Sequence, residues 1–354
     1  MARKTKSASK DVCDGYFSLQ WHITDSCDQR CKHCYIFNSK NAKNNLKETL
    51  LDTLLLILDD FLASCRKMKK YPYLAVTGGD PLLHPDIWKF LECVSDKKCG
   101  FSIMGNPFHV TKETAKRLYD LGLDIYQMSI DGFEKTHDYF RKPGSFQATL
   151  DAIETLKKAK IHPTIMMTVS KQNAQEIPEL IDWLAQNTSV DMISFARYCP
   201  THQDTESMLT PNEYKQFLES VWKVYDKYKN ARRPLLTFKD HLWKPFLFEK
   251  GLFSIDDTND LIMDGCHCGT SGLCVLADGT VYACRRMYSP VGKVPEQSIF
   301  DIFVSDQLEK YRSWDKIENC KDCKLLNYCR GCRAVAYGVT GNFHSADPQC
   351  WFKN

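Results

Sequence analysis

Three cysteines near the N-terminus have the residue type and the spacing that metal chemistry needs. Cys27, Cys31 and Cys34 form the pattern C-x3-C-x2-C, and no fourth cysteine lies near them in the sequence. Three thiolates this close together can hold three irons of a [4Fe–4S] cluster and leave the fourth iron open for a small molecule. A zinc knuckle or buried free thiols are the alternatives, although structural zinc prefers four closed ligands. The triad therefore favours an iron–sulfur cluster with one open coordination position.

The spacing of the triad resembles the signature of the radical S-adenosylmethionine (SAM) enzymes. The resemblance implies that SAM binds the open iron through its amino and carboxylate groups. It also implies that one electron from the cluster cleaves SAM to a 5′-deoxyadenosyl radical, which abstracts a hydrogen atom from the substrate. The protein would contribute binding, orientation and the exclusion of water.

The same resemblance points to further residues of a SAM site. Gly78-Gly79-Asp80-Pro81 is similar to the Gly-Gly-Glu-Pro motif that binds the SAM ammonium group in this family, but Asp80 is one methylene shorter than glutamate. The two glycines would permit positive φ angles and a close approach of the backbone to a ligand. An ordinary turn between a strand and a helix is the alternative.

The segment from Gln127 to Phe146 resembles the part of peptide-modifying radical SAM enzymes that lies near the SAM ribose or carboxylate. It offers Ser129 and Asp131 as SAM-binding candidates. Arg141 could hold the SAM carboxylate or form a structural ion pair. Arg197, at the end of a later predicted strand, is a further candidate for the adenosine end or the substrate.

The C-terminal part of the chain contains a second group of cysteines that resembles the SPASM domain, which binds two auxiliary [4Fe–4S] clusters. The resemblance assigns Cys268, Cys274, Cys284 and Cys332 to the first auxiliary cluster and Cys320, Cys323, Cys329 and Cys350 to the second. With the triad, this makes three [4Fe–4S] clusters. Only two residues separate Cys329 from Cys332, where the family usually has three, so Cys266 is a possible replacement ligand. A pair of zinc sites is the alternative for the C-x2-C pairs.

The elements that must position these residues follow from the hydrophobic pattern. Six β-rich segments alternate with amphipathic helical segments between about residues 16 and 200, which predicts a parallel sheet with helical crossovers. The predicted strands are Phe17–Ile23, Leu74–Thr77, Phe101–Met104, Ile125–Ile130, Thr164–Val169 and Met192–Arg197. We therefore expect an α/β fold: a partial (β/α)6 TIM-like barrel, with the active residues at the carboxyl ends of the strands.

Local signals add detail to this plan. A helix with Leu51, Leu54, Leu55, Leu58 and Leu62 on one face follows a polar loop at 38–45, and a capping box at Thr210–Glu213 starts a helix that runs to Tyr228. A tight Asp278-Gly279 hairpin is expected before Cys284. The predicted division is a tail at 1–15, the barrel at 16–235, a bridging segment at 236–262 and the SPASM domain at 263–354.

Composition limits the class of protein. The 354 residues contain 17 cysteines and a net charge of +3, and no signal peptide or long apolar run. Many cysteines without a secretion signal indicate metal or cluster ligation in a reducing cytoplasm rather than disulfides. The balanced charge gives no reason to expect nucleic acid or membrane binding. We expect Cys199, just after the sixth strand, to be a bystander on the active-site face.

The SPASM resemblance implies a peptide or protein substrate, and we favour a maturase of ribosomally made peptides that crosslinks, epimerises or oxidises its substrate. A reductant of the flavodoxin or ferredoxin type is implied. The stretch before Cys27 is short for a leader-recognition domain, so a separate leader-recognition protein or the barrel itself would take that role.

Two alternatives to this function stay open. Anaerobic sulfatase maturases, which generate formylglycine, place a carboxylate where this chain has Arg285, although Asp240 could replace it. A non-catalytic iron–sulfur redox or regulatory protein would not need the Gly-Gly-Asp-Pro segment.

Overall fold

The computed structural model describes residues 15–34, 46–200, 205–255 and 264–353. The predicted polar loop at 38–45 and all but the last residue of the predicted tail lie outside these residues. Within the described ranges, no helix is long and apolar enough to cross a membrane.

All six predicted strands form, and neighbours in the sheet are parallel. They are β1 (Tyr16–His22), β2 (Tyr71–Thr77), β3 (Gly100–Met104), β4 (Ile125–Ser129), β5 (His162–Val169) and β6 (Met192–Arg197). The short strand β7 (Leu235–Leu236) adds to β6. Strands β1 to β6 follow one another in the sheet in chain order, which is the strand order of a (β/α) barrel. The prediction of an α/β parallel-sheet barrel is confirmed.

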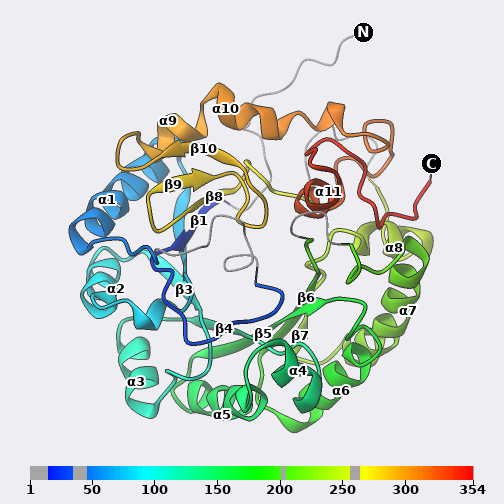
Figure 1. The fold of residues 1–354 in the computed structure, drawn as a ribbon, viewed down its shortest axis with the longest axis horizontal. Helices are drawn as coiled ribbons and strands as arrows, with labels where there is room; N and C mark the ends of the chain where they lie inside the picture. The colour runs from blue at the N-terminus through cyan, green and yellow to red at the C-terminus, as the bar shows by residue number, and fades with distance from the viewer. Residues whose placement is uncertain (1–14, 35–45, 201–204, 256–263, 354) are drawn as a thin grey trace.

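Helices surround the strands on the outside of this barrel (Figure 1). They are α1 (Leu51–Met68), α2 (Ile87–Asp96), α3 (Lys112–Asp120), α4 (Glu134–Phe140), α5 (Ser145–Lys158), α6 (Ile177–Asn187), α7 (Pro211–Tyr228) and α8 (Trp243–Glu249). The predicted capping box of α7 is present, since Thr210 and Glu213 each accept a hydrogen bond from the other's backbone N–H. This closes the exposed donors at the start of the helix.

The buried face of α1 differs in part from the prediction. Leu54 and Leu58 are buried as expected, but Ile57 and Phe61 complete the buried face. The other three predicted residues, Leu51, Leu55 and Leu62, are only partly buried. The reason is the position of α1, which contacts the C-terminal helix α9 (Ile299–Phe303) as well as the sheet.

The C-terminal part continues the barrel sheet. Strand β8 (Gly272–Val275) pairs in parallel with β1, and β9 (Thr280–Tyr282) and β10 (Pro290–Lys293) extend the sheet antiparallel. A Cβ at Gly272 would lie 2.4 Å from the carbonyl oxygen of Ser18, so only glycine permits this pairing. The predicted hairpin forms, with Gly279 at φ +81.

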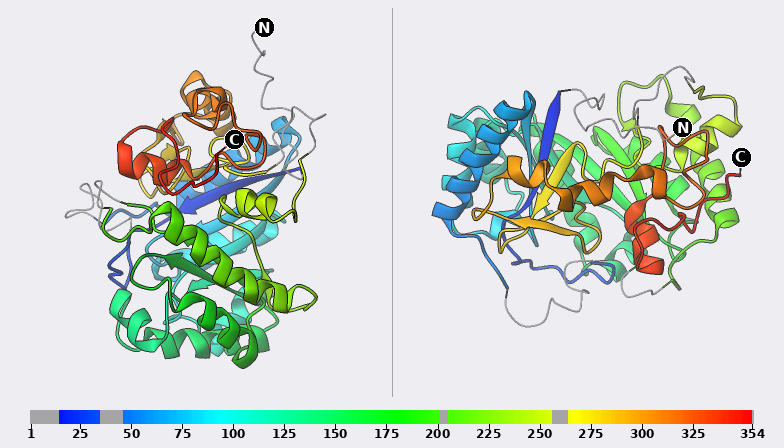
Figure 2. Two further views of the ribbon diagram at one scale, coloured as in Figure 1. Left: turned by 90° about the vertical axis from the view of Figure 1, so that its right-hand side faces the viewer. Right: turned by 90° about the horizontal axis from the view of Figure 1, so that it is seen from above.

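The remaining C-terminal elements lie across the gap between β1 and β6 and complete the ring of Figure 1; Figure 2 shows them on one side of the barrel, opposite α3 to α6. They are α9, α10 (Asp306–Glu309) and α11 (Arg333–Thr340), with short 3-10 turns η3 (Lys310–Arg312) and η4 (Trp314–Lys316). The C-terminal segment thus covers the open side of the partial barrel.

Candidate active site and cluster-binding sites

The cysteine triad lies in the loop that follows β1, at the carboxyl end of the strand, as the barrel rule predicts. All three cysteines are partly buried and unpaired. The N–H of Cys34 donates to the carbonyl of Cys31 at 3.0 Å, which forms a turn between two of them. Burial raises the pKa of Cys27 to about 11, so a thiolate here needs a metal to stabilise it. This donor set fits an iron–sulfur cluster.

The Gly-Gly-Asp-Pro segment after β2 packs directly against the triad loop. The N–H groups of Gly79 and Asp80 donate to the carbonyls of Thr24 and Ser26, each at 2.7 Å. A Cβ on Gly78 would lie 2.4 Å from the Thr24 carbonyl oxygen. The glycines are therefore required by close contact with the triad loop, and neither has a positive φ.

Asp80 has a buried carboxylate oxygen that could accept a hydrogen bond from SAM. The residue is fully buried, and its Oδ1 accepts a hydrogen bond from the N–H of Leu82 at the start of η2 (Pro81–Leu83). Its Oδ2 is buried and has no hydrogen-bond partner among the residues that the structure describes. Burial raises the pKa of Asp80 to about 6. An ammonium group would satisfy this orphaned oxygen, as the family motif implies.

Asp131 and Arg141 form a buried pair beside the triad. Arg141 Nε donates to Asp131 Oδ2 at 2.6 Å, and the N–H of Thr168 donates to Asp131 Oδ1 at 2.8 Å. Burial alone would raise the pKa of Asp131, but the charge of Arg141 holds it at about 2. Arg141 Nη1 also lies 3.7 Å from Cys31 Sγ. Arg141 is thus a structural ion-pair partner that also faces the thiol of Cys31.

The other two SAM candidates occupy different environments. Ser129 is partly buried at the last position of β4, on the carboxyl-terminal face of the barrel. Arg197 is buried, and Asp240 accepts from its Nε at 2.9 Å. Asp347 accepts from Nη1 and Nη2, each at 2.8 Å. The structure does not bring Arg197 to the triad; its pairs join β6 to the C-terminal segment, and Asp240 is held in the same network.

A pocket of about 170 Å³ lies next to the triad loop at the carboxyl ends of β5 and β6. Its lining comprises Lys32, His33, Tyr139, Phe140, Thr168, Ser170, Gln172, Tyr198 and Ser207. Its position beside the triad and its polar lining suit a small polar molecule or part of a substrate.

The four cysteines assigned to the second auxiliary cluster line one pocket together. Cys320, Cys323, Cys329 and Cys350 surround it, with Asp347 and Gly331. This set is the one that the SPASM resemblance implies, and four thiols around one pocket fit a [4Fe–4S] cluster.

Cys329 and Cys332 are assigned to different auxiliary clusters although only two residues separate them. The backbone conformation of these two residues explains how both assignments can hold. Arg330 and Gly331 both have left-handed backbone conformations, with φ of +62 and +60. The carbonyl oxygens of Leu326 and Cys266 accept hydrogen bonds from the Arg330 guanidinium, at 2.8 and 3.0 Å, which compensates the unusual backbone of this non-glycine residue. The chain reverses here, so Cys329 faces the second pocket while Cys332 begins α11 elsewhere.

The cysteines assigned to the first auxiliary cluster lie in a group of six thiols. The group comprises Cys199, Cys266, Cys268, Cys274, Cys284 and Cys332, which interact electrostatically with one another. A hydrogen bond from Cys268 lowers the pKa of Cys284 to about 6. Four thiols suffice for a cluster, so two of the six are spare.

Sequence reasoning missed several members of this environment. Cys199 Sγ donates to the Ala334 carbonyl at 3.1 Å and lies beside Cys332. Arg286 Nη1 lies 3.8 Å from Cys332 Sγ. Arg285 Nη2 lies 3.2 Å from His22 Nδ1, and His22 Nε2 lies 2.7 Å from Asp25. The signal available in the sequence was the Arg285-Arg286 pair directly after a cysteine.

Comparison with known proteins decides the family. Residues 21–184 match the model of the Radical SAM superfamily, and residues 266–324 match the iron–sulfur cluster-binding domain called SPASM. The chain is a radical SAM enzyme with a SPASM domain. This excludes the non-catalytic redox protein as an interpretation.

Alignments with individual relatives cover nearly the whole of this chain. An AdoMet-dependent heme synthase of Methanosarcina barkeri is 28% identical over 346 residues, 95% of this chain and 96% of the relative. The mycofactocin maturase MftC of Mycobacterium tuberculosis is 23% identical, over 95% of this chain and 83% of that protein. SuiB of Streptococcus suis bound to its precursor peptide SuiA has the same fold, with a TM-score of 0.73, 17% identity and coverage of 95% and 76%.

Proposed function

We propose that this radical SAM enzyme modifies a peptide or protein by hydrogen abstraction and passes an electron to an auxiliary cluster. The observation that carries the proposal is a direct structural link between the cysteine triad and the cysteines of the first auxiliary site. Strands β1 and β8, which pair in the sheet, provide this link. Arg285, which follows Cys284, contacts His22 at the end of β1, and His22 contacts Asp25 in the triad loop. The site of hydrogen abstraction and the auxiliary cluster that accepts the electron would thus be joined through one continuous sheet.

Each residue set has a defined role in this proposal. Cys27, Cys31 and Cys34 hold the SAM cluster, and Asp80 holds the SAM ammonium group. Bound SAM supplies the 5′-deoxyadenosyl radical that removes a hydrogen atom from the substrate. Arg141 and Asp131 fix the triad loop, and Ser129 lies on the face where SAM would bind. The eight assigned C-terminal cysteines would hold two auxiliary clusters, which makes three clusters in all.

The peptide substrate is supported by the relatives. MftC is named a maturase, and the structure of SuiB contains a precursor peptide. Loss of a hydrogen atom from the peptide leaves a radical, and transfer of one electron to an auxiliary cluster with release of a proton gives a product oxidised by two electrons. A cytoplasmic location, a flavodoxin or ferredoxin as reductant and a separate leader-recognition protein belong to the same proposal.

A tetrapyrrole substrate is the second candidate, because relatives named as heme synthases show higher identity than MftC. Lys239 lies near Arg286 and is exposed to solvent. Such cations suit the propionate groups of a porphyrin. The formylglycine alternative has less support, because Asp240 is engaged with Arg197.

The test is anaerobic turnover of the reconstituted enzyme with a reductant and SAM. We expect 5′-deoxyadenosine to form in step with a peptide product that has lost two hydrogens, measured by mass spectrometry, when peptides encoded beside the gene are supplied. Turnover of iron coproporphyrin III instead of any peptide would overturn the peptide proposal. A Cys27/Cys31/Cys34→Ala variant is the matched control, and its iron content should fall from about twelve to about eight per chain.

A further inference from the structure

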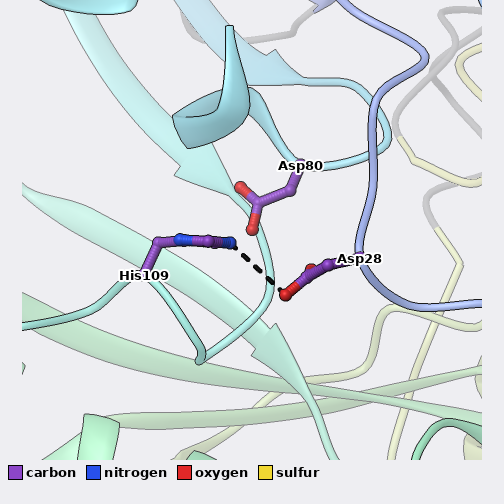
Figure 3. A group of neighbouring side chains, drawn as sticks. All are labelled: Asp28, Asp80 and His109. Atoms are coloured by element: carbon purple, nitrogen blue, oxygen red, sulfur yellow. Dashed lines mark ion pairs between the residues drawn. The ribbon is translucent and has the colours of Figure 1, made fainter.

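A second acid and a histidine lie beside the orphaned oxygen of Asp80. Asp28, Asp80 and His109 each direct one ligand atom to a common point, and these atoms all lie within 4.8 Å of one another. Figure 3 shows the three side chains converging from the triad loop, the segment after β2 and the segment after β3. Nothing in the family motif includes Asp28 or His109.

The positions of these side chains are fixed. Asn106 Nδ2 donates to Asp28 Oδ1 at 2.6 Å, which leaves Asp28 Oδ2 facing the group. Asp28 Oδ2 lies 3.4 Å from His109 Nε2 and 3.9 Å from Lys142 Nζ. His109 Nε2 is buried and, like Asp80 Oδ2, makes no hydrogen bond within the described residues. Two buried polar atoms that make no hydrogen bond within the described residues, one of them with only a 3.4 Å ion pair, point to a ligand at this position.

The geometry matches an ammonium group. Three atoms within 4.8 Å of one another all lie within about 2.8 Å of a central point, which is the usual length of a charge-assisted N–H···O bond. A primary ammonium has three donors and no acceptor. Two carboxylate oxygens and one imidazole nitrogen can supply three acceptors, so the group can satisfy all three donors.

We propose that Asp28 and His109 complete the binding site for the ammonium group of SAM, with Asp80 as the third acceptor. Asp80 is one methylene shorter than the glutamate of the family motif, and the two added acceptors compensate for this shorter reach. Asn106 is a positioning residue that orients Asp28. The inference depends on SAM binding and not on which substrate is modified, so it stands whether or not the peptide proposal holds.

The test compares the binding of SAM with that of an analogue in which hydrogen replaces the α-amino group, measured by equilibrium dialysis with the reconstituted protein. Asp28→Asn and His109→Gln should each weaken SAM binding about tenfold or more, since each removes a charge-assisted hydrogen bond or its acceptor. Neither should change the affinity for the analogue. Asp59→Asn, at an exposed acid on α1, is the control for loss of one negative charge and should bind both ligands as the wild type does.

Iron content is measured for every variant, because Asp28 adjoins Cys27. If Asp28→Asn loses its cluster, the proposal is tested by His109→Gln, which lies on another loop. The proposal is overturned if the variants bind SAM as tightly as the wild type. It is also overturned if they weaken the analogue as much as SAM, which would mean a structural role. A third result would also overturn the proposal: stoichiometric binding of Zn²⁺ or Mn²⁺ that is lost in Asp28→Asn and that SAM does not displace. Such binding would make the three side chains a metal site.

Discussion

The two groups of C-terminal cysteines that the SPASM resemblance assigns to auxiliary clusters are built differently. The second has four cysteines around one pocket, and the nearby Arg330 is occupied with backbone carbonyls. The first has six thiols in one electrostatic group and a guanidinium, that of Arg286, 3.8 Å from a cysteine sulfur. The second site therefore has no thiol to spare among the described residues, whereas the first has spare thiols and a guanidinium that contacts a cysteine sulfur directly. We infer that the second is chiefly structural and the first is tuned for electron transfer.

The largest difference should appear when one cysteine is removed from each site. Cys329→Ala should lose about four irons per chain, because four thiolates are needed for a closed [4Fe–4S] cluster, and the C-terminal segment should become sensitive to protease. Cys266→Ala should keep its iron content, because five thiols remain in the first site. Iron analysis and limited proteolysis check this. Equal iron loss in both variants would show that the first site has no spare ligand.

A second variant should affect both sites at once. Asp347 lines the second pocket, accepts from the N–H of Cys332 at 2.7 Å and pairs with Arg197. Arg197→Met leaves two buried carboxylates without their cation, which typically costs about 3–5 kcal/mol. We expect a large fall in thermal stability and partial iron loss. Lys97→Met, which removes an exposed ion pair with Asp59, is the control and should change stability by less than about 1 kcal/mol. Unchanged stability in Arg197→Met would contradict the role of Arg197 in joining β6 to the C-terminal segment.

The third prediction concerns electron transfer alone. Arg286 donates to a thiol of the first site, and hydrogen bonds from cations to cluster sulfurs raise the reduction potential. Arg286→Gln should therefore make the first auxiliary cluster harder to reduce, with the reduced fraction at a fixed potential falling about tenfold. An EPR-monitored redox titration checks this. The signal of the second cluster serves as the internal control, and a shift in that signal instead would reverse our assignment of roles.

The smallest effect is expected at Cys199. Its thiol donates to the Ala334 carbonyl, and a serine hydroxyl can donate to the same acceptor. Cys199→Ser should keep the wild-type iron content and unfolding temperature within error. Loss of iron in this variant would make Cys199 a ligand and would leave Cys266 as one of the spare thiols.

Much of the fold could be predicted because it depends on local pattern. The six strands, the capping box at Thr210 and the hairpin at Gly279 follow from side-chain periodicity and turn chemistry, which neighbouring residues determine. The grouping of Cys320, Cys323, Cys329 and Cys350 followed from the family resemblance.

The rest depends on contacts between distant parts of the chain. Arg197 looked like a ligand-binding residue at the end of a strand, but its partners Asp240 and Asp347 are far away in sequence. Cys199 joins the first auxiliary site only because the C-terminal segment packs against β6. His109 carries no local signal at all, and its convergence with Asp28 depends on the sheet order, which places β1 and β3 on either side of β2.

The pairing of β1 with β8 has a consequence for synthesis of the protein. Residues 18–21 pair with residues 272–275, so about three quarters of the chain must leave the ribosome before β1 gains this neighbour. Until then β1 presents an unpaired strand edge, which is a template for pairing with other chains. Pairing between such distant segments is also slow. Nascent or truncated chains that end before residue 272 should therefore aggregate through β1. Pairing of β8 with β1 covers this strand edge and prevents the aggregation.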